Sequence, residues 1–264
     1  MKLQALSPDL YAGRRWKKPT VYTFAARDRT TPVVLKELAT AAMALPLGFL
    51  KGERSYVMVA IMGIEEGMNL FVADNGRWLG NYIPASYRTH PFHHAKTGDG
   101  KYLVAVDEES GLVSDTDGEP FFENGKVSKT VDEVAKFLEE VVRSREITLR
   151  ICDLLNKHEL IQPWPIKINT KAGERQIDGL YCVHEARLKD LSPEAFAELR
   201  KAGALPLVYC QLLSMQNIVR LRQLGALRIR ATEKLQERAS AKSASSELDL
   251  SFFDASITSG GSRT

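Results

Sequence analysis

Residues 80–94, GNYIPASYRTHPFHH, contain the densest group of chemically active side chains in this chain. Three of the five histidines lie here beside Arg88: His90, His93 and His94. Histidines four residues apart, as His90 and His94 are, can share a metal ion when they lie on one helix. Pro91 disfavours such a helix because it restrains His90 to extended geometry. No HExxH motif is present, so the sequence predicts a partly exposed loop with neutral histidines, no metal site and no cofactor.

Motifs for nucleophilic or phosphate chemistry are missing from the chain. There is no GxSxG nucleophile elbow, no GxxxxGK[ST] phosphate loop and no CxxC pair. The acids at 107–110 and 115–119 lie in turn-like sequence, where carboxylates stay solvated. Ser214 falls in an apolar helix, where a hydroxyl usually bonds back to the preceding turn. The sequence therefore predicts no catalytic residue and favours binding over catalysis.

A binding surface is the chemistry that the segment does support. Trp78 and Tyr82 share one face of a predicted strand, and Arg88 and Phe92 follow. Aromatic side chains beside an arginine are typical of a pocket for a peptide or a carboxylate. The alternative is structural: the three aromatic rings belong to the core and Arg88 pairs with an acid.

The elements that must position this segment read as strands and turns in the first half. Strands are predicted at 55–63 and 101–107 from runs of apolar strand formers. Hairpins are predicted at 69–83 around Asn75-Gly76 and at 119–128 around Asn124-Gly125, because Asn-Gly favours the tight turns of hairpins. One short helix is expected at 32–44, begun by Thr31 and Pro32.

Helices are predicted from Thr130 onward, where Thr130 and Glu133 form a predicted capping box. Apolar residues then recur at helical spacing as far as Leu155. Further helices are predicted at 191–203, capped by Ser192, and at 205–225, with a hairpin around Gly173 before them. The fold class that follows is α+β, with an N-terminal half rich in antiparallel β-meander packed with a helical C-terminal half.

Charge and composition divide the chain into three parts. Residues 1–29 carry seven Lys and Arg against two Asp, whereas the whole chain has a net charge of only +3. Residues 1–20 are therefore interpreted as a basic, solvated N-terminal arm and 21–239 as a single domain. Serine makes up eight of the 25 residues of 240–264, which predicts a disordered tail. A basic arm on a near-neutral body argues against nucleic-acid binding.

Targeting features point to the cytoplasm. The basic N-terminus is not followed by the apolar stretch of a secretory signal, and no apolar run is long enough to span a membrane. Cys152, Cys182 and Cys210 are odd in number and widely spaced, which favours a reducing compartment over disulfides.

Two segments together resemble the SapC family. Residues 69–92 carry an Asn…Gly-x-Trp…Pro…Arg…Pro-Phe progression, and 177–224 carry a Gly-Leu-Tyr segment followed by a leucine-rich helix and a final helix. The resemblance extends over roughly residues 13–227. It adds Asn69 to the candidate ligand-binding residues, which become Asn69, Trp78, Tyr82, Arg88, His90, Phe92 and His93. It supplies no catalytic residue.

The resemblance implies a bacterial accessory or binding protein, with a role in peptide or nutrient uptake or in peptide modification. A protein or peptide partner is expected at Trp78–Phe92 and at the apolar island Leu248–Phe253 of the tail. Two alternatives stay open. One is an enzyme that acts on a peptide or amino-acid derivative through histidines of 80–94, and the other is a component associated with the bacterial surface layer.

Overall fold

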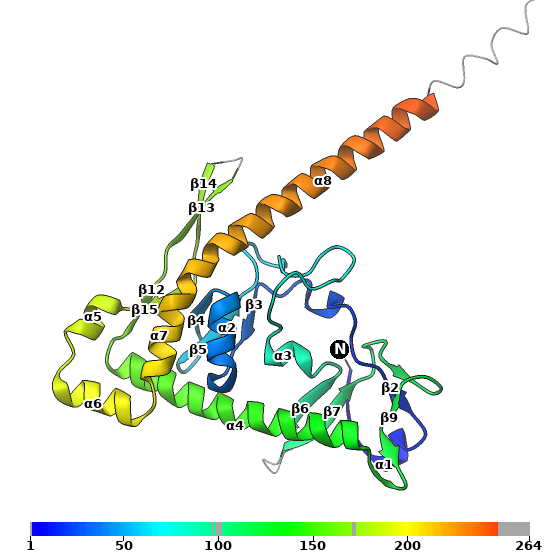
Figure 1. The fold of residues 1–264 in the computed structure, drawn as a ribbon, viewed down its shortest axis with the longest axis horizontal. Coiled ribbons are helices and arrows are strands. Elements are labelled where there is room, and N and C mark those ends of the chain that lie inside the picture. Colours follow the sequence, from blue (N-terminus) through cyan, green and yellow to red (C-terminus); the bar gives the residue numbers. More distant parts are fainter. Residues whose placement is uncertain (1, 97, 99–101, 171–172, 248–264) are drawn as a thin grey trace, which may run out of the picture. The chain divides into compact units, whose positions relative to one another are not determined.

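The structure is a computed structural model that describes residues 2–96, 98, 102–170 and 173–247 (Figure 1). Residues Met1–Arg222 form one compact unit and Gln223–Thr264 a second. As far as it is described, the second unit is a continuation of the helix α8 (Ile218–Glu247). The sheets and the candidate site described below all belong to the first unit.

The described strands form five antiparallel sheets. The largest has the order β12 (Ile161–Pro163), β15 (Leu180–Val183), β4 (Leu47–Lys51), β5 (Tyr56–Ile61) and β3 (Thr30–Pro32). Two three-stranded sheets follow the orders β1 (Leu3–Ala5), β7 (Tyr102–Asp107), β6 (Phe92–Lys96) and β8 (Val113–Ser114), β2 (Arg15–Trp16), β9 (Glu119–Pro120). Two hairpins pair β10 (Phe122–Glu123) with β11 (Lys126–Val127) and β13 (Ile166–Thr170) with β14 (Gly173–Ile177).

Besides α8, the helices are α1 (Pro8–Tyr11), α2 (Leu38–Ala44), α3 (Ala85–Arg88), α4 (Lys129–Lys157), α5 (Glu185–Lys189), α6 (Pro193–Lys201) and α7 (Leu205–Ser214). Short 3₁₀ turns occupy Thr23–Ala25, Leu35–Glu37 and Met215–Asn217. In the described part of the chain, none of the helices has the length and apolar character needed to cross a membrane. The predicted α+β class with antiparallel sheets is confirmed.

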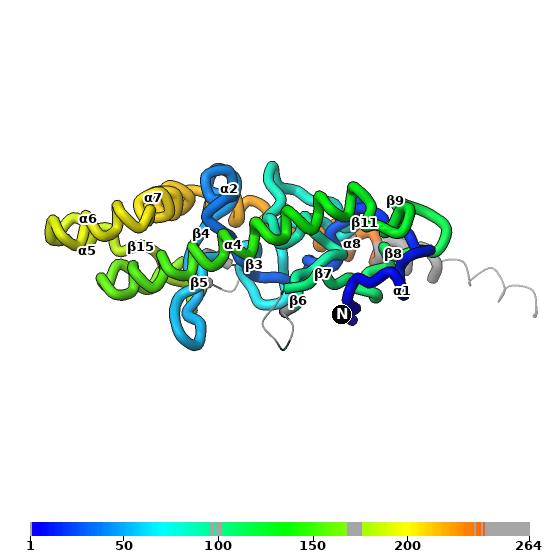
Figure 2. Tube along the Cα trace, turned by 90° about the horizontal axis from the view of Figure 1, so that it is seen from below, coloured from blue at the N-terminus to red at the C-terminus, as the bar shows by residue number. Residues whose placement is uncertain are grey.

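The long helix α4 joins the two main sheets, since it packs against β5 of one and β6 of the other (Figure 2). Its buried face is apolar, as the helical spacing predicts, except for Ser144 and Thr148. These two hydroxyls accept hydrogen bonds from the backbone N–H groups of Lys36 and Leu35, at 2.9 Å each. Those amides lie at the start of the 3₁₀ turn before α2 and would otherwise lack a partner. The two polar residues on the buried face of α4 therefore cap that turn.

The N-terminal residues are part of the fold, and the interpretation of a solvated arm is wrong. Leu3–Ala5 pair with β7, and Tyr11 and Trp16 are buried. Trp16 meets the ring of Phe92 edge-on at 4.6 Å, inside a core cluster that also contains residues of α4. Burying the apolar area of the Tyr11 and Trp16 rings outweighs the hydration of the basic residues between them in the sequence. Those basic residues remain at the surface.

The two Asn-Gly turns behave differently. Asn124 and Gly125 have φ angles of 51° and 74° and join β10 to β11, as predicted. The hairpin predicted at 69–83 forms only next to its turn, where one antiparallel bridge joins Val72 to Trp78 and Ala73 N–H donates to Arg77 O at 2.9 Å. Gly76 packs closely against Val21 and Thr23, and its carbonyl accepts a hydrogen bond from the Tyr22 N–H at 2.7 Å.

Helix boundaries also differ from the prediction. Ser128, not Thr130, caps α4 and accepts a hydrogen bond from the Val131 N–H. Gly225 does not end a helix; the break lies at Met215–Asn217, and α8 continues through the glycine. The disorder predicted from residue 240 is wrong for 240–247, which belong to α8, while 248–264, including the apolar island, lie outside the described residues.

Replacing Ser128 with alanine is expected to lower the free energy of unfolding by about 1 kcal/mol, the usual cost of losing an N-cap. Thr130→Ala should cost less than half as much, because Thr130 lies inside the first turn and its hydroxyl contacts the Ser128 hydroxyl at 3.2 Å without being the N-cap acceptor. Urea denaturation of the two variants measures the difference. Equal losses would contradict the assignment of Ser128 as the cap.

Candidate functional site

The segment after Trp78 is held in place by the buried carboxylate of Glu37. Its Oε2 accepts hydrogen bonds from the Tyr82 hydroxyl at 2.6 Å and from the Ala85 N–H at 2.8 Å, and its Oε1 accepts one from the Val34 N–H at 3.2 Å. Burial, followed by this carboxylate, raises the pKa of the Tyr82 phenol, so Tyr82 is a neutral donor. Glu37 thus fixes the start of α3, which carries Arg88.

Three of the predicted ligand-binding residues make contacts within the protein that stabilise the fold. Phe92 is completely buried in the core cluster. Asn69 is also fully buried; its amide donates to Ala25 O at 3.0 Å and accepts from Phe71 N–H at 2.9 Å. Trp78 stacks on Phe71 and donates its indole N–H to Tyr82 O at 3.0 Å. The core position of Phe92 matches the structural alternative, whereas Trp78 is only partly buried, and Asn69 shapes a turn.

Arg88 and His90 do line a pocket, with a volume of about 390 Å³. Its other walls come from distant parts of the sequence: Trp16, Lys18, Pro19, Tyr22, Thr89, Thr130, Glu133, Val134 and Phe137. The N-terminal residues and the first turns of α4 therefore complete it. The volume lies in the range of sites for small ligands.

The Arg88 guanidinium lies 4.8 Å from the centre of the Phe137 ring and 5.6 Å from that of Tyr82. One of its nitrogens donates to the Tyr82 hydroxyl at 3.2 Å. Within the described residues Arg88 forms no ion pair, so the structural alternative of pairing with an acid does not hold there. The stacking orients a guanidinium whose remaining N–H groups are available to an anion.

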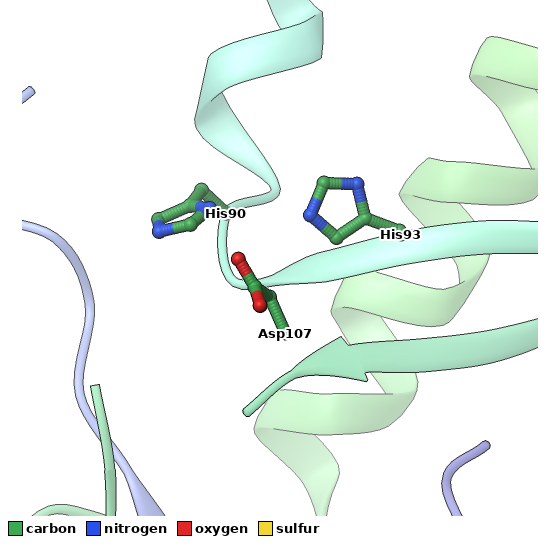
Figure 3. A group of neighbouring side chains, drawn as sticks. All are labelled: His90, His93 and Asp107. Atoms are coloured by element: carbon green, nitrogen blue, oxygen red, sulfur yellow. The ribbon is translucent and has the colours of Figure 1, made fainter. Parts of the chain in front are cut away.

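A second group lies beside the pocket and shares His90 with it. His90, His93 and Asp107 place one possible metal-ligating atom each within 4.8 Å of one another, and Figure 3 shows the three side chains close together. His90 and Asp107 are buried, with 6% and 7% of their surface exposed. The predicted exposed loop is therefore wrong for this part: His90 is covered, and His93 belongs to β6.

Strand register explains why His93 and Asp107 meet. Phe92 pairs with Val106 and His93 with Ala105, and both Phe92 and Val106 point into the core. Because successive side chains alternate between faces, His93 and Asp107 project together from the opposite face as diagonal neighbours. His90 precedes β6 and is held by stacking on the Phe24 ring at 3.9 Å.

Burial determines the protonation of these histidines. It lowers the pKa of His90 to about 4; His93 adds to the effect and the Asp107 carboxylate opposes it. Burial also lowers the pKa of His93, again against Asp107. Both imidazoles are therefore neutral at pH 7, the form that can ligate a metal ion or accept a proton.

Asp107 and the N-terminal part of the pocket were missed by the sequence-based interpretation. Asp107 ends a strand that was predicted, but its partner strand β6 was assigned to a loop. The sequence TGDG at 97–100, a cluster of turn residues between the histidines and Tyr102, was the available signal for a hairpin. No local pattern marks Trp16, Lys18 or Tyr22 as pocket residues.

Comparison with known proteins gives one result. The family model described as SapC matches residues 6–221. No curated protein matches the chain, and no solved structure does.

Proposed function

The chain belongs to the SapC family, and on that premise we propose that it is a binding protein whose pocket beside Arg88 takes a ligand with a carboxylate group, of the peptide or amino-acid class. Such a protein would act as an accessory component in the uptake or modification of peptides or nutrients. The observation that carries the proposal is the Arg88 guanidinium, stacked between Phe137 and Tyr82 at the pocket wall without an acidic partner in the described chain.

The charge of the pocket suits an anion. Lys18 and Arg88 provide two positive charges against the single acid Glu133, while His90 is neutral at pH 7. A planar guanidinium forms two parallel hydrogen bonds with a carboxylate, which gives orientation as well as affinity. A free ligand carboxylate is therefore favoured over a neutral amide.

The walls of the pocket suit an apolar side chain on the same ligand. Trp16, Tyr22 and Phe137 contribute aromatic surface. The indole Nε1 of Trp16 is buried and has no hydrogen-bond partner among the described residues. Because this N–H has no exposed surface, Trp16 offers a ligand its aromatic ring and not its indole N–H.

A direct test compares N-acetyl-phenylalanine with its C-terminal amide, by calorimetry or ligand-observed NMR. The acid is expected to bind at least about 10-fold more tightly, and Arg88→Met should weaken its binding by about 10- to 100-fold, because hydrogen bonds between charged groups contribute about 1.5–3 kcal/mol. Methionine keeps an apolar stem against Phe137, so the fold should persist.

Arg77→Met serves as the matched control, since Arg77 is exposed and lies outside the pocket lining. It should leave the affinity unchanged. Equal binding of acid and amide, or equal effects of the two arginine variants, would contradict the proposal.

A second candidate function is an enzyme that acts on a peptide or amino-acid derivative. The observation that favours this candidate is that His90, His93 and Asp107 lie close together, next to the proposed ligand pocket. Neutral imidazoles beside a carboxylate are suited to proton transfer or to metal binding. Turnover of a peptide substrate by the purified chain, abolished in His93→Ala, would favour this candidate over simple binding.

A further inference from the structure

The group formed by His90, His93 and Asp107 has the composition of a metal site. Two imidazole nitrogens and one carboxylate oxygen are donors that divalent transition metals such as Zn²⁺ and Fe²⁺ accept in proteins. His93 and Asp107 lie on the paired strands β6 and β7, whose register fixes their spacing, and His90 lies just before β6. Their sequence separation, with two residues between the histidines and 13 between His93 and Asp107, gives no helical motif that would have identified them.

The distances are close to those of a loaded site. Each of the three possible ligand atoms lies within 4.8 Å of the others. With metal–ligand bonds of about 2.0–2.2 Å, atoms around one tetrahedral ion are about 3.5 Å apart, so the side chains would have to close by about 1 Å. Rotation of the side chains on an unchanged backbone would be the movement required.

One nitrogen of the group has no hydrogen-bond partner in the described part of the chain, and a bound ion would supply a coordination partner. The Nε2 of His93 is buried and has no hydrogen-bond partner among the described residues. Figure 3 shows a ring nitrogen of His93 directed toward His90 and Asp107. A buried imidazole nitrogen without a partner is costly in a folded protein, and a bound cation is one of the few explanations with a chemical use.

The carboxylate is oriented by the backbone rather than by a counter-ion. Asp107 Oδ1 accepts hydrogen bonds from the N–H groups of Lys2 and Glu109, at 3.2 Å each. Within the described residues, Asp107 forms no ion pair with a lysine or arginine side chain. Backbone donors that hold a carboxylate in place are the usual outer contacts of a metal ligand, because they fix its direction.

We propose that His90, His93 and Asp107 bind one divalent transition-metal ion, for which Zn²⁺ is the probe. Three protein ligands leave at least one coordination position for water or for another ligand, as in catalytic zinc sites. His90 also lines the pocket beside Arg88, so the ion would lie next to the place proposed for the ligand carboxylate. The metal site does not depend on that proposed function, since Arg88 is not one of its ligands.

The competing explanation is a purely structural one. Asp107 would then serve only to accept the two backbone N–H groups at the end of β7, and His90 only to stack on Phe24. Asp107→Asn separates the two explanations. Its side-chain oxygen still accepts both backbone hydrogen bonds, whereas the negative charge that a cation requires is lost.

The experiment is calorimetric titration of the chelator-treated full chain with ZnCl₂ at pH 7.5, followed by Co²⁺ absorption as a probe of coordination. One equivalent of Zn²⁺ is expected to bind. Asp107→Asn and His93→Gln should each weaken binding by at least about 100-fold, more than the loss typical of an outer contact. Circular dichroism should show that both variants keep the helical content of the parent chain.

His94→Gln is the matched control, because His94 follows His93 on β6 and contacts Tyr102 instead of the group. It should keep one equivalent of Zn²⁺ at unchanged affinity. Absence of binding to the parent chain would overturn the proposal. So would binding that Asp107→Asn and His93→Gln leave unchanged, or that His94→Gln weakens as much as they do. Arg88→Met should still bind Zn²⁺, so failure of the ligand proposal and failure of the metal proposal are distinguishable.

Discussion

Replacing Phe92 with alanine is expected to lower the free energy of unfolding by about 3–5 kcal/mol, the range for removing a fully buried aromatic ring. Phe92 has no exposed surface and packs against Trp16 and Phe121, with ring centres at 4.6 and 5.8 Å. The substitution would leave a cavity where the N-terminal residues, β6 and α4 meet. Urea or guanidinium denaturation gives the measurement.

Phe196→Ala is the control for this change, because Phe196 lies on α6 with 38% of its surface exposed. Its loss of stability should be less than half of that caused by Phe92→Ala. A small effect of Phe92→Ala on stability, together with a large effect on ligand affinity in the folded variant, would instead return Phe92 to the set of ligand-binding residues.

Replacing Glu37 with alanine is expected to cost at least about 4 kcal/mol of stability, because three donors lose their acceptor at once and hydrogen bonds to a charged group contribute about 1.5–3 kcal/mol each. Two of these donors are backbone amides, of Val34 and Ala85, that are buried with no other acceptor in the described chain. The third is the Tyr82 hydroxyl, which also contacts Arg88.

A second measurement identifies the cause of this loss. Glu37 contributes, after burial, to raising the pKa of Tyr82. Spectroscopic titration of the folded Glu37→Ala variant should therefore give a Tyr82 pKa nearer its usual value. Glu140→Ala is the control: Glu140 pairs with Lys36 at the surface, and an exposed pair contributes at most about 1 kcal/mol. Similar losses in the two glutamate variants would contradict the anchoring role of Glu37.

The binding and metal proposals have different consequences for the same segment. Arg88 acts through its guanidinium and the aromatic rings that orient it, whereas His93 acts from the strand that follows. The family assignment is compatible with both, because it names no ligand and no reaction. Measurements on Arg88→Met and Asp107→Asn together would show whether the segment binds a carboxylate ligand, a metal ion or both.

Elements defined by residues near one another in sequence were predictable. Asn124 and Gly125 specify a tight turn by their own backbone preferences, and the structure has it. Ser192, Pro193 and Gly203 mark the ends of α6 in the same local way. The buried strand β5 followed from its apolar run. In each case the free-energy difference that decides the conformation lies within a few residues, so the sequence alone determined it.

Only the tertiary structure decided the site. Trp16 and Phe137 are 121 positions apart and become neighbours because the N-terminal strands pack against α4. Asp107 meets His93 because of one particular register between β6 and β7, and a shift of one residue would have turned the two side chains to opposite faces. That register is fixed by burial of Phe92 and Val106 in a core built from the whole unit, which no local pattern records.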